Sequence, residues 1–319
     1  IMHLSARAID ETRRFAARGR RAIAGRQAVR ILKPEVKEAI AMKLIGKVLA
    51  WLAAAFVILI VGLNVWGRLT LGSHSPADDA QRDPAANRVV MVFGATGSAG
   101  DGLLEAAMTA PEVEKVYAVT RRLSPRLEAG KASGRVEVIL LEDFTDYSGI
   151  TEQLSEVNTV LWGLGTTSLG MDSELYRHIH EDFPTSFVSA WLAPREGKGP
   201  MAFHYVTGMG TGEDESAQWA RDKGRAERRL AEMEEGTGLR TFGHRSAWIR
   251  PTDDNANLLI YLAEPLLMPG YLVIRGTDLG NAMLEISTRT EELPNGALID
   301  NKDAIDYADA YRKNESKRG

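Results

Sequence analysis

The chain has 319 residues with a formal net charge of −4 at pH 7, and 44% of its residues are hydrophobic. This composition excludes an intrinsically disordered chain, and the small net charge gives no indication of nucleic-acid binding. The absence of cysteine excludes disulfides and thiol catalysis, and the six scattered histidines predict no metal site.

Residues 1–41 form a basic segment with few acids. Two interpretations of it stay open. It is either an Arg-rich targeting or membrane-surface segment, or an extension upstream of a start at Met42, because a Met followed by Lys43 and an apolar run is typical of a signal anchor. The arginines of the segment are Arg7, Arg13, Arg14, Arg18, Arg20, Arg21, Arg26 and Arg30.

A run without charged residues follows from Val48 to Gly67. At 1.5 Å per residue, it matches the roughly 30 Å thickness of a bilayer core. Trp51 and Trp66 stand near its ends, where indole rings favour the membrane interface. The alternative is a buried helix of a soluble protein, but such a helix rarely runs this long without a polar face. We therefore predict a single transmembrane helix over residues 42–68, with the membrane as a partner.

The remaining boundaries follow from composition. Residues 69–86 are polar and rich in Pro, Asp and Ser, which predicts a linker, and residues 311–319 are expected to be a solvated tail. Over residues 87–310, short apolar runs alternate with helix-like segments, which predicts an α/β fold with a doubly wound parallel sheet. The runs are RVVMVF, KVYAVT, VEVILL, TVLWGL and AFHYVT, and the notable helix-like segments are 98–109, 173–194 and 215–235.

A glycine-rich turn follows the first of these runs and opens a helix-like segment. Gly94 permits a tight turn, Gly97 lets the backbone approach a pyrophosphate, and Gly100 allows close packing of the helix on the strand. The free N–H groups at the helix start would then bind the phosphates. A purely structural glycine turn is the competing interpretation. The candidate cofactor-binding residues of the turn are Gly94, Thr96, Gly97, Ser98, Ala99 and Gly100.

Cofactor choice is indicated by the residues after the second run, Arg121 and Arg122. An acid at this place would bind the ribose 2′-hydroxyl of NAD, whereas arginines offer a bidentate grip on the 2′-phosphate of NADP. NADP is therefore favoured over NAD, with solvated arginines as the alternative.

Two further strand ends complete the predicted cofactor site. The third run is followed by Asp143 and Phe144, which could meet the adenine. The fourth ends near Gly163 and Gly165, which are small enough to pass beneath the cofactor.

These motifs together resemble the atypical short-chain dehydrogenase/reductase superfamily. The resemblance covers roughly residues 87–305 and is carried by GATGSAG, LGTT, YVTGMGT and WARDKGRAERRL. Within the superfamily the chain is most similar to a bacterial epimerase-like branch that includes the Tat-interacting oxidoreductase-like proteins. The resemblance implies a Rossmann fold that binds a nicotinamide dinucleotide.

The superfamily's chemistry uses a Tyr-x-x-x-Lys pair with an upstream serine. Here Trp219 occupies the tyrosine position, Lys223 is retained, and Thr207 stands at the place of the serine. Lys223 could still hold the nicotinamide ribose. An indole only donates a hydrogen bond and does not titrate, so Trp219 cannot exchange a proton with a substrate. Arg245-Ser246-Ala247 also departs from the Arg-Pro-Gly of relatives.

Tyr205 shares a strand face with Thr207, because side chains two residues apart point the same way. It could supply a displaced phenol, although a tyrosine packed beside the sheet is the favoured interpretation. His178 and His180 follow the LGTT motif and are expected at the surface.

Two functions compete. The first is a membrane-anchored NADP-binding protein with a degenerate catalytic tyrosine, acting as a cofactor-dependent sensor, scaffold or weak oxidoreductase, with a membrane-protein partner or a second copy of itself. The second is an active NADP-dependent oxidoreductase or epimerase with a non-standard proton donor.

Membrane orientation rests on two conflicting arguments. The positive-inside rule exports the domain, because lysines and arginines crowd the N-terminal flank. The location of NADP in the cytoplasm favours a domain on that side, and we expect the cytoplasmic placement. The flanking cations are Arg30, Lys33, Lys37, Lys43 and Lys47 before the helix, and Arg68, Arg82 and Arg88 after it.

Overall fold

The computed structural model describes residues 34–195, 199–233 and 236–317. Most of the basic segment predicted over residues 1–41 therefore lies outside the described residues. The chain divides within its first described helix into two units, one up to Val61 and one from Gly62 onwards, and each is described by itself.

Helix α2 runs without interruption from Pro34 to Thr70. From Glu35 onwards it is long and apolar enough to cross a membrane, and none of its most apolar window is buried in the protein. Large apolar side chains such as those of Trp51 and Leu69 are mostly exposed, at 77% and 80%. A soluble core helix would bury these groups. A signal sequence shares the length, the composition and the place near the N-terminus.

Seven parallel strands form one sheet in the described part of the chain, in the order β3-β2-β1-β4-β5-β6-β9. Two further strands, β7 and β8, form a small parallel sheet. The central order, in which β1 lies between β2 and β4, is that of a doubly wound Rossmann sheet. The strands are β1 Val89–Phe93, β2 Lys115–Thr120, β3 Val136–Leu140, β4 Thr159–Trp162, β5 Met201–Val206, β6 Leu239–Arg245, β7 Trp248–Arg250, β8 Val273–Arg275 and β9 Ala297–Asp300.

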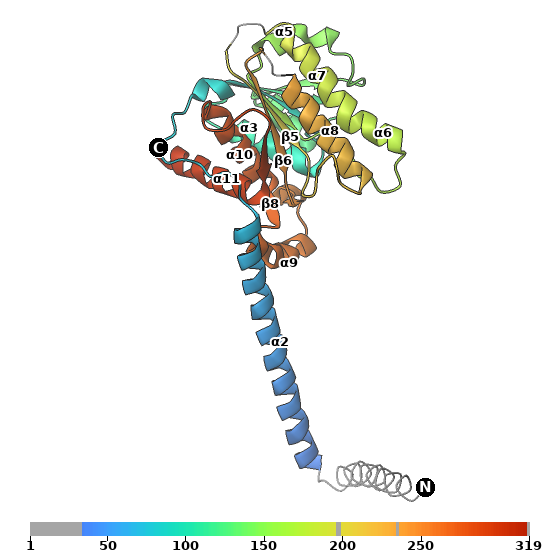
Figure 1. Ribbon diagram of the computed structural model, residues 1–319, viewed down its shortest axis with the longest axis vertical. Helices are drawn as coiled ribbons and strands as arrows, with labels where there is room; N and C mark the ends of the chain where they lie inside the picture. Colours follow the sequence, from blue (N-terminus) through green and yellow to red (C-terminus); the bar gives the residue numbers. More distant parts are fainter. Residues whose placement is uncertain (1–33, 196–198, 234–235, 318–319) are drawn as a thin grey trace, which may run out of the picture. The chain divides into compact units, whose positions relative to one another are not determined.

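Helices cover both faces of the large sheet (Figure 1). The α-helices are α3 Ser98–Thr109, α4 Pro125–Ala132, α5 Thr151–Glu156, α6 Ser173–Arg177, α7 Phe183–Leu192, α8 Gln218–Glu232, α9 Leu258–Leu267, α10 Gly276–Thr288 and α11 Asn301–Ser316. A π-helical turn, η3, joins α6 to α7 over His178–Asp182. Short 3-10 turns are η1 Pro84–Asn87, η2 Ser148–Ile150, η4 Asp253–Asn255 and η5 Met268–Gly270.

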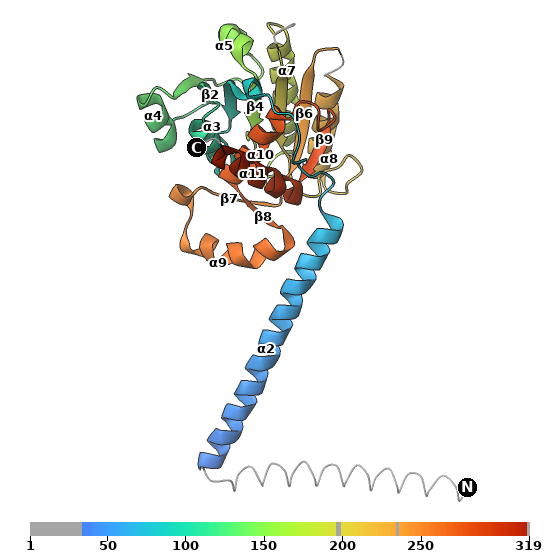
Figure 2. The ribbon, with the colours of Figure 1, turned by 90° about the vertical axis from the view of Figure 1, so that its left-hand side faces the viewer.

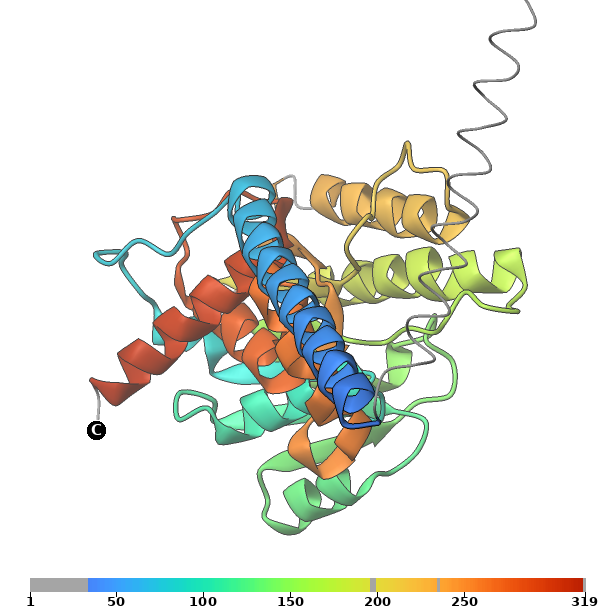
Figure 3. The same ribbon diagram turned by 90° about the horizontal axis from the view of Figure 1, so that it is seen from below.

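The core consists of two apolar layers, one on each side of the sheet. Along β1, Val90 and Val92 pack toward α3, α10 and α11, while Met91 and Phe93 pack toward α7 and α8. This follows from the alternation of side chains along a strand. Figure 3 shows α7 and α8 side by side on one flank and α11 on the other. Because both faces are covered, the central strands are apolar throughout, as parallel strands are.

The predicted fold is confirmed: all five predicted strands are present as β1 to β5. Strands β6 and β9 were not predicted, because β6 includes Arg240, Thr241 and His244 and β9 is short. The tail predicted from residue 311 is wrong in its first part. Helix α11 continues to Ser316, because Tyr311 is buried against the domain and this tertiary contact stabilises the last turns.

The segment predicted as a linker is attached to the domain. We call residues 71–83 the strap. The backbone N–H groups of Ser73 and His74 donate to the carboxylate of Asp303 at 3.2 and 3.1 Å. At the other end, the N–H of Asp83 donates to the carbonyl of Thr288 at 2.8 Å. The strap therefore follows the ends of α10 and α11.

Candidate functional site

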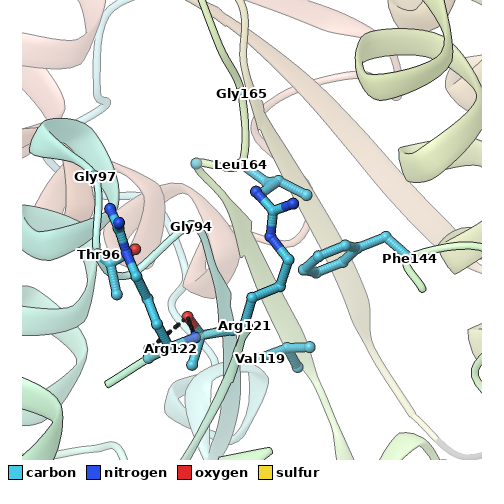
Figure 4. Close-up of a pocket in the computed structure, with 11 residues that line it drawn as sticks. Gly94, Thr96, Gly97, Val119, Arg121, Arg122, Phe144, Leu164 and Gly165 are labelled. Atoms are coloured by element: carbon cyan, nitrogen blue, oxygen red, sulfur yellow. Dashed lines mark hydrogen bonds between the residues drawn. The ribbon is translucent and has the colours of Figure 1, made fainter. Parts of the chain in front are cut away.

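A crevice opens at the carboxyl ends of β1 and β4. Here the strand order of the sheet reverses, because β2 and β3 lie on one side of β1 and β4 to β6 lie on the other. In doubly wound sheets ligands bind at this switch point, because the flanking connections leave on opposite faces. The cleft here has a volume of about 440 Å³. Figure 4 shows its lining residues, which are Gly94, Thr96, Gly97, Val119, Thr120, Arg121, Arg122, Phe144, Gly163, Leu164 and Gly165.

The glycine turn forms one wall of the cleft. Gly94 has a φ of +75°, and a Cβ atom there would lie 2.5 Å from the carbonyl oxygen of Gly163. A Cβ atom on Gly100 would lie 2.0 Å from the carbonyl oxygen of Gly94. No residue with a side chain fits either position. The turn therefore allows α3 to begin directly against the end of β1.

Helix α3 begins at Ser98, after the N-cap Gly97, and its N-terminus has no side-chain cap. The N–H groups of Ser98 and Ala99 are thus among those left to an external acceptor, as at helix starts that bind phosphate. Ser98 also lines a second cleft of about 710 Å³, which shares Thr96 and Gly97 with the first.

Arg121 and Arg122 both line the first cleft, directly after β2. In Figure 4 the side chain of Arg122 extends toward Thr96 and Gly97, whereas that of Arg121 extends toward Leu164 and Phe144. The hydroxyl of Thr120 accepts from the N–H of Arg122 at 3.3 Å and donates to its carbonyl at 2.9 Å. The two side chains extend to different sides of the same cleft, one toward the glycine turn and one toward the apolar side.

The third predicted strand end contributes Phe144 to the cleft. Its ring is buried in an aromatic cluster, 6.3 Å from Phe93 and 5.6 Å from Phe183 between centroids. Asp143 is exposed and is not among the residues that line the cleft. Its carboxylate accepts from the side chain and the N–H of Thr145 at 2.6 and 2.8 Å, and these bonds lower its pKa.

The fourth strand end passes close to α3 and to η3. A Cβ atom on Gly163 would lie 3.1 Å from the Cα of Gly100, and one on Gly165 would lie 2.8 Å from the Cε1 of His180. Small residues at these positions therefore let the chain pass along the base of the cleft.

The expectation of a surface position is wrong for His180, which is 1% exposed. Its Nε2 lies 3.3 Å from the N–H of Thr166, and burial lowers its pKa to about 3. The hydroxyl of Tyr205 donates to the carbonyl of His180 at 2.7 Å. Because Tyr205 is buried, its pKa lies well above the ordinary value, and the phenol packs beside the sheet. His178 is partly exposed and lies 2.8 Å from Asp182.

A second cluster lies at the carboxyl end of β5, the strand next to β4. The hydroxyl of Thr207 donates to Glu227 at 2.8 Å, and Arg245 bonds the same carboxylate at 2.7 Å. Sequence reasoning missed Glu227. Its signal was the spacing of four residues from Lys223, which puts both side chains on one face of α8.

Lys223 is directed into this cluster. Its Nζ donates to the carbonyl of Thr207 at 2.6 Å, and burial lowers its pKa to about 8. Trp219 stands one turn earlier on α8 and packs over the loop after β5. Cβ atoms on Gly208 and Gly210 would lie 3.7 and 3.9 Å from its ring. The structure thus brings together Thr207, Lys223 and Trp219.

No protein-family model matches the chain, and no curated protein is significantly similar to it in sequence. Solved structures do resemble it. One is an oxidoreductase of the short-chain dehydrogenase/reductase family from Burkholderia thailandensis, with 16% identity and a TM-score of 0.53, covering 69% of this chain and 92% of that one.

Two other similar structures were solved with cofactors. A 3-oxoacyl-[acyl-carrier protein] reductase from Brucella melitensis in complex with NAD has 15% identity and a TM-score of 0.51, covering 69% of this chain and 97% of that one. L-Sorbose reductase from Gluconobacter frateurii, complexed with NADPH and L-sorbose, has 14% identity and a TM-score of 0.51, covering 67% and 94%. The chain therefore has the Rossmann fold of the short-chain dehydrogenase/reductase proteins.

Proposed function

We propose that the protein is a membrane-anchored, NADP-binding relative of the short-chain dehydrogenases that works as a cofactor-dependent sensor or scaffold, with weak oxidoreductase turnover at most. The observation that carries this proposal is Trp219 at the position of the catalytic tyrosine, one turn before Lys223. An indole N–H has no accessible titration, so the site has no proton donor at the usual place.

The cofactor proposal rests on the cleft. The open N-terminus of α3 suits a pyrophosphate, and the aromatic wall at Phe144 suits an adenine. Arg121 and Arg122 line the same cleft and offer charge-assisted hydrogen bonds to a 2′-phosphate. The similar structures with NAD and with NADPH support a nicotinamide dinucleotide, and the two arginines favour NADP.

The Thr207 cluster supports binding more than turnover. The hydroxyl that would orient a substrate carbonyl donates to Glu227 instead, and Lys223 is held at a main-chain carbonyl. From that place the ammonium group could hold a ribose hydroxyl of the nicotinamide nucleotide. When bound, the dinucleotide would supply hydride chemistry, while these residues would only position it.

One observation favours the alternative of an active oxidoreductase or epimerase. Lys223 has a pKa of about 8, because burial disfavours its charged form. A lysine that titrates near neutral pH can exchange protons in catalysis. This candidate places Lys223 itself as the non-standard proton donor.

Anchoring completes the proposal. The length and apolarity of α2 support a single membrane span, and the cytoplasm is the compartment that supplies NADP. We place the domain on the cytoplasmic side. The similarity of the chain to the Tat-interacting oxidoreductase-like branch stays a proposal that rests on the motifs alone. A membrane-protein partner, or a second copy of the chain, is consistent with an anchored sensor or scaffold.

The test is a titration of the full-length protein in detergent with NADPH and with NADH, followed by nucleotide fluorescence. The sensor proposal expects saturable NADPH binding and no oxidation of NADPH above background when simple aldehydes and ketones are added. Rapid NADPH oxidation with such a carbonyl would favour the enzyme, and no binding of either nucleotide would reject both.

A further inference from the structure

Helix α9 has its polarity reversed. Its sequence is LLIYLAEPLL, and the residue of the helix that is buried is the charged one, Glu264. The leucines at 258, 259 and 262 are exposed at 72%, 75% and 61%. A surface helix of a soluble domain turns its apolar stripe to the core and its charges to water. Helix α9 does the opposite, so its outer face requires an apolar partner.

Ion pairs fix this orientation. The carboxylate of Glu264 accepts from Arg250 at 3.0 Å and from Arg275 at 3.2 Å, so the inner face of α9 is tied to β7 and β8. Rotation of α9 about its axis would bury the leucines. It would also break the ion pair between Glu264 and the buried Arg250 and leave a buried charge unpaired, which is strongly unfavourable. The outward display of leucines is therefore built into the domain.

The turn η5, which directly follows α9, contacts the last turns of α2, which belong to the same unit as the domain. A Cβ atom on Gly67 would lie 2.8 Å from the carbonyl oxygen of Gly270, at the end of η5. Apolar side chains of these turns, including those of Val65 and Leu69, are exposed as well. The exposed apolar surface of α9 thus adjoins that of the anchor helix where the anchor leaves its apolar run.

We propose that α9 is an interfacial membrane helix, which lies on the same bilayer that α2 spans. Ten residues at 1.5 Å reach about 15 Å, half of a bilayer core, so α9 cannot cross. A helix with one apolar face and fixed polar contacts on the other buries its apolar side roughly 5–10 Å into the headgroup boundary. The proposal rests on the membrane anchor of the proposed function.

A bilayer fits the surface better than a second copy of the chain. The adjoining partner of α9 is a helix with the composition of a membrane span, so a single apolar medium covers both surfaces. The carboxylates and guanidinium groups around α9 are largely paired with one another, as Arg250 is with Asp253 and Glu264. The contact proposed for α9 is therefore mainly apolar.

The turn before α9, η4, is bonded to α3, since Asn255 donates to Asp101 at 3.0 Å. Thr252 and Arg126 bond the same carboxylate at 2.6 and 2.9 Å. One carboxylate thus links the segment before α9 to the helix whose N-terminus we assign to the cofactor phosphates.

The experiment uses full-length protein in phosphatidylcholine vesicles. Because the chain has no cysteine, a single cysteine variant carries one fluorescent label. Leu259→Cys reports α9, Leu59→Cys reports the anchor, and Glu152→Cys on α5 is the control, because α5 and α9 lie at opposite ends of the domain in Figures 1 and 2. Quenching is measured with shallow and deep nitroxide lipids and with aqueous iodide.

We expect shallow nitroxides to quench the label at Leu259, deep nitroxides to quench that at Leu59, and iodide to quench that at Glu152. Adding Leu262→Glu to the Leu259→Cys variant should abolish the lipid quenching, whereas Leu262→Met should retain it. Far-UV circular dichroism of each variant shows that the domain has folded.

Each remaining outcome decides between the proposals. If iodide quenches the Leu259 label as readily as the control while the Leu59 label lies deep, the α9 inference is overturned and the anchor stands. If the Leu259 label is shielded from both lipid and iodide, a protein surface covers α9 and the inference is overturned. If the Leu59 label is not quenched by lipid, the anchor fails, while shallow quenching at Leu259 still supports docking of α9.

Discussion

The amino group of Lys223 donates to the main-chain carbonyl of Thr207, 2.6 Å away. The hydroxyl of the same threonine donates in turn to Glu227, four residues further along α8. Of the three candidate catalytic residues, Lys223 and Thr207 are thus bonded to each other, and Thr207 is also bonded to the carboxylate of Glu227. The third, Trp219, cannot move a proton, which supports the proposal that this cluster binds the nucleotide and does not transfer protons.

Lys223→Met should stabilise the domain and weaken nucleotide binding. Burial lowers the pKa of Lys223 to about 8, so the charged form carries an energetic penalty at pH 7 that the variant removes. The shift from 10.5 to about 8 corresponds to about 3 kcal/mol, and the lost hydrogen bond reduces the gain to about 1–3 kcal/mol.

Denaturant unfolding at several pH values checks this. The penalty is complete below pH 8 and disappears as pH rises toward 10.5, so the difference between the variant and the wild type should shrink over that range. A less stable variant at pH 7 would contradict the prediction.

Replacing Arg121 and Arg122 with alanine should remove the preference for NADPH. Each loses a charge-assisted contact worth about 1.5–3 kcal/mol, so NADPH binding by the double variant should weaken roughly 10²- to 10⁴-fold while NADH binding changes little. The control is Arg228→Ala, an arginine of α8 that is half exposed and pairs with Glu213 and Glu232. Tighter binding of NADH than of NADPH by the wild type would show that NADP is the wrong assignment.

Trp219→Tyr should create NADPH-dependent carbonyl reduction. A phenol one turn before Lys223 restores a proton donor, and general acid catalysis contributes about 10²–10⁴-fold. Steady-state NADPH oxidation with a panel of carbonyls measures the gain, and Trp219→Phe should show none. A fast wild-type rate that survives Trp219→Phe would place the proton donor elsewhere.

The domain should lose stability in acid. The pKa of His180 and that of His244 are lowered to about 3, and that of His204 is lowered as well, in each case because burial disfavours the imidazolium. The unfolded chain takes up protons near pH 6.5 and the folded chain does not, so stability is complete above pH 6.5 and falls below it, toward pH 3.

Each of these histidines adds about 1.4 kcal/mol per pH unit to the slope. Chemical unfolding between pH 7 and about pH 4.5 should therefore show a steeply falling free energy, and His180→Asn should flatten it by that amount. An unchanged slope for His180→Asn would contradict the burial argument.

The domain should be protected from protease added to sealed right-side-out vesicles. Placement of NADP in the cytoplasm requires this orientation, although the charges that flank α2 oppose it. Immunoblotting of the domain before and after detergent lysis measures protection. Digestion in intact vesicles would show that charge bias determines the topology.

Local signals account for what could be predicted from the sequence. The turn at Gly94 and Gly100 can be predicted because a side chain at either position would collide with the backbone, so glycine is required there. The first five strands can be predicted because they are apolar runs. Burial of His180 and the role of Glu227 depend instead on where η3 and α8 meet the sheet, which no local pattern reports. Asp143 was expected beside Phe144 in the cleft, yet its side chain is taken up by its own turn.

The strap limits how far the domain can move from α2. A flexible linker over residues 71–83 would have an end-to-end distance of about 20 Å, and the domain could move over that distance from α2. Here the segment is bonded along its length to α10 and α11, and that freedom is gone. If α2 anchors the protein in a membrane, as we propose, the domain meets other molecules by lateral diffusion in a plane. Its search for partners is then two-dimensional.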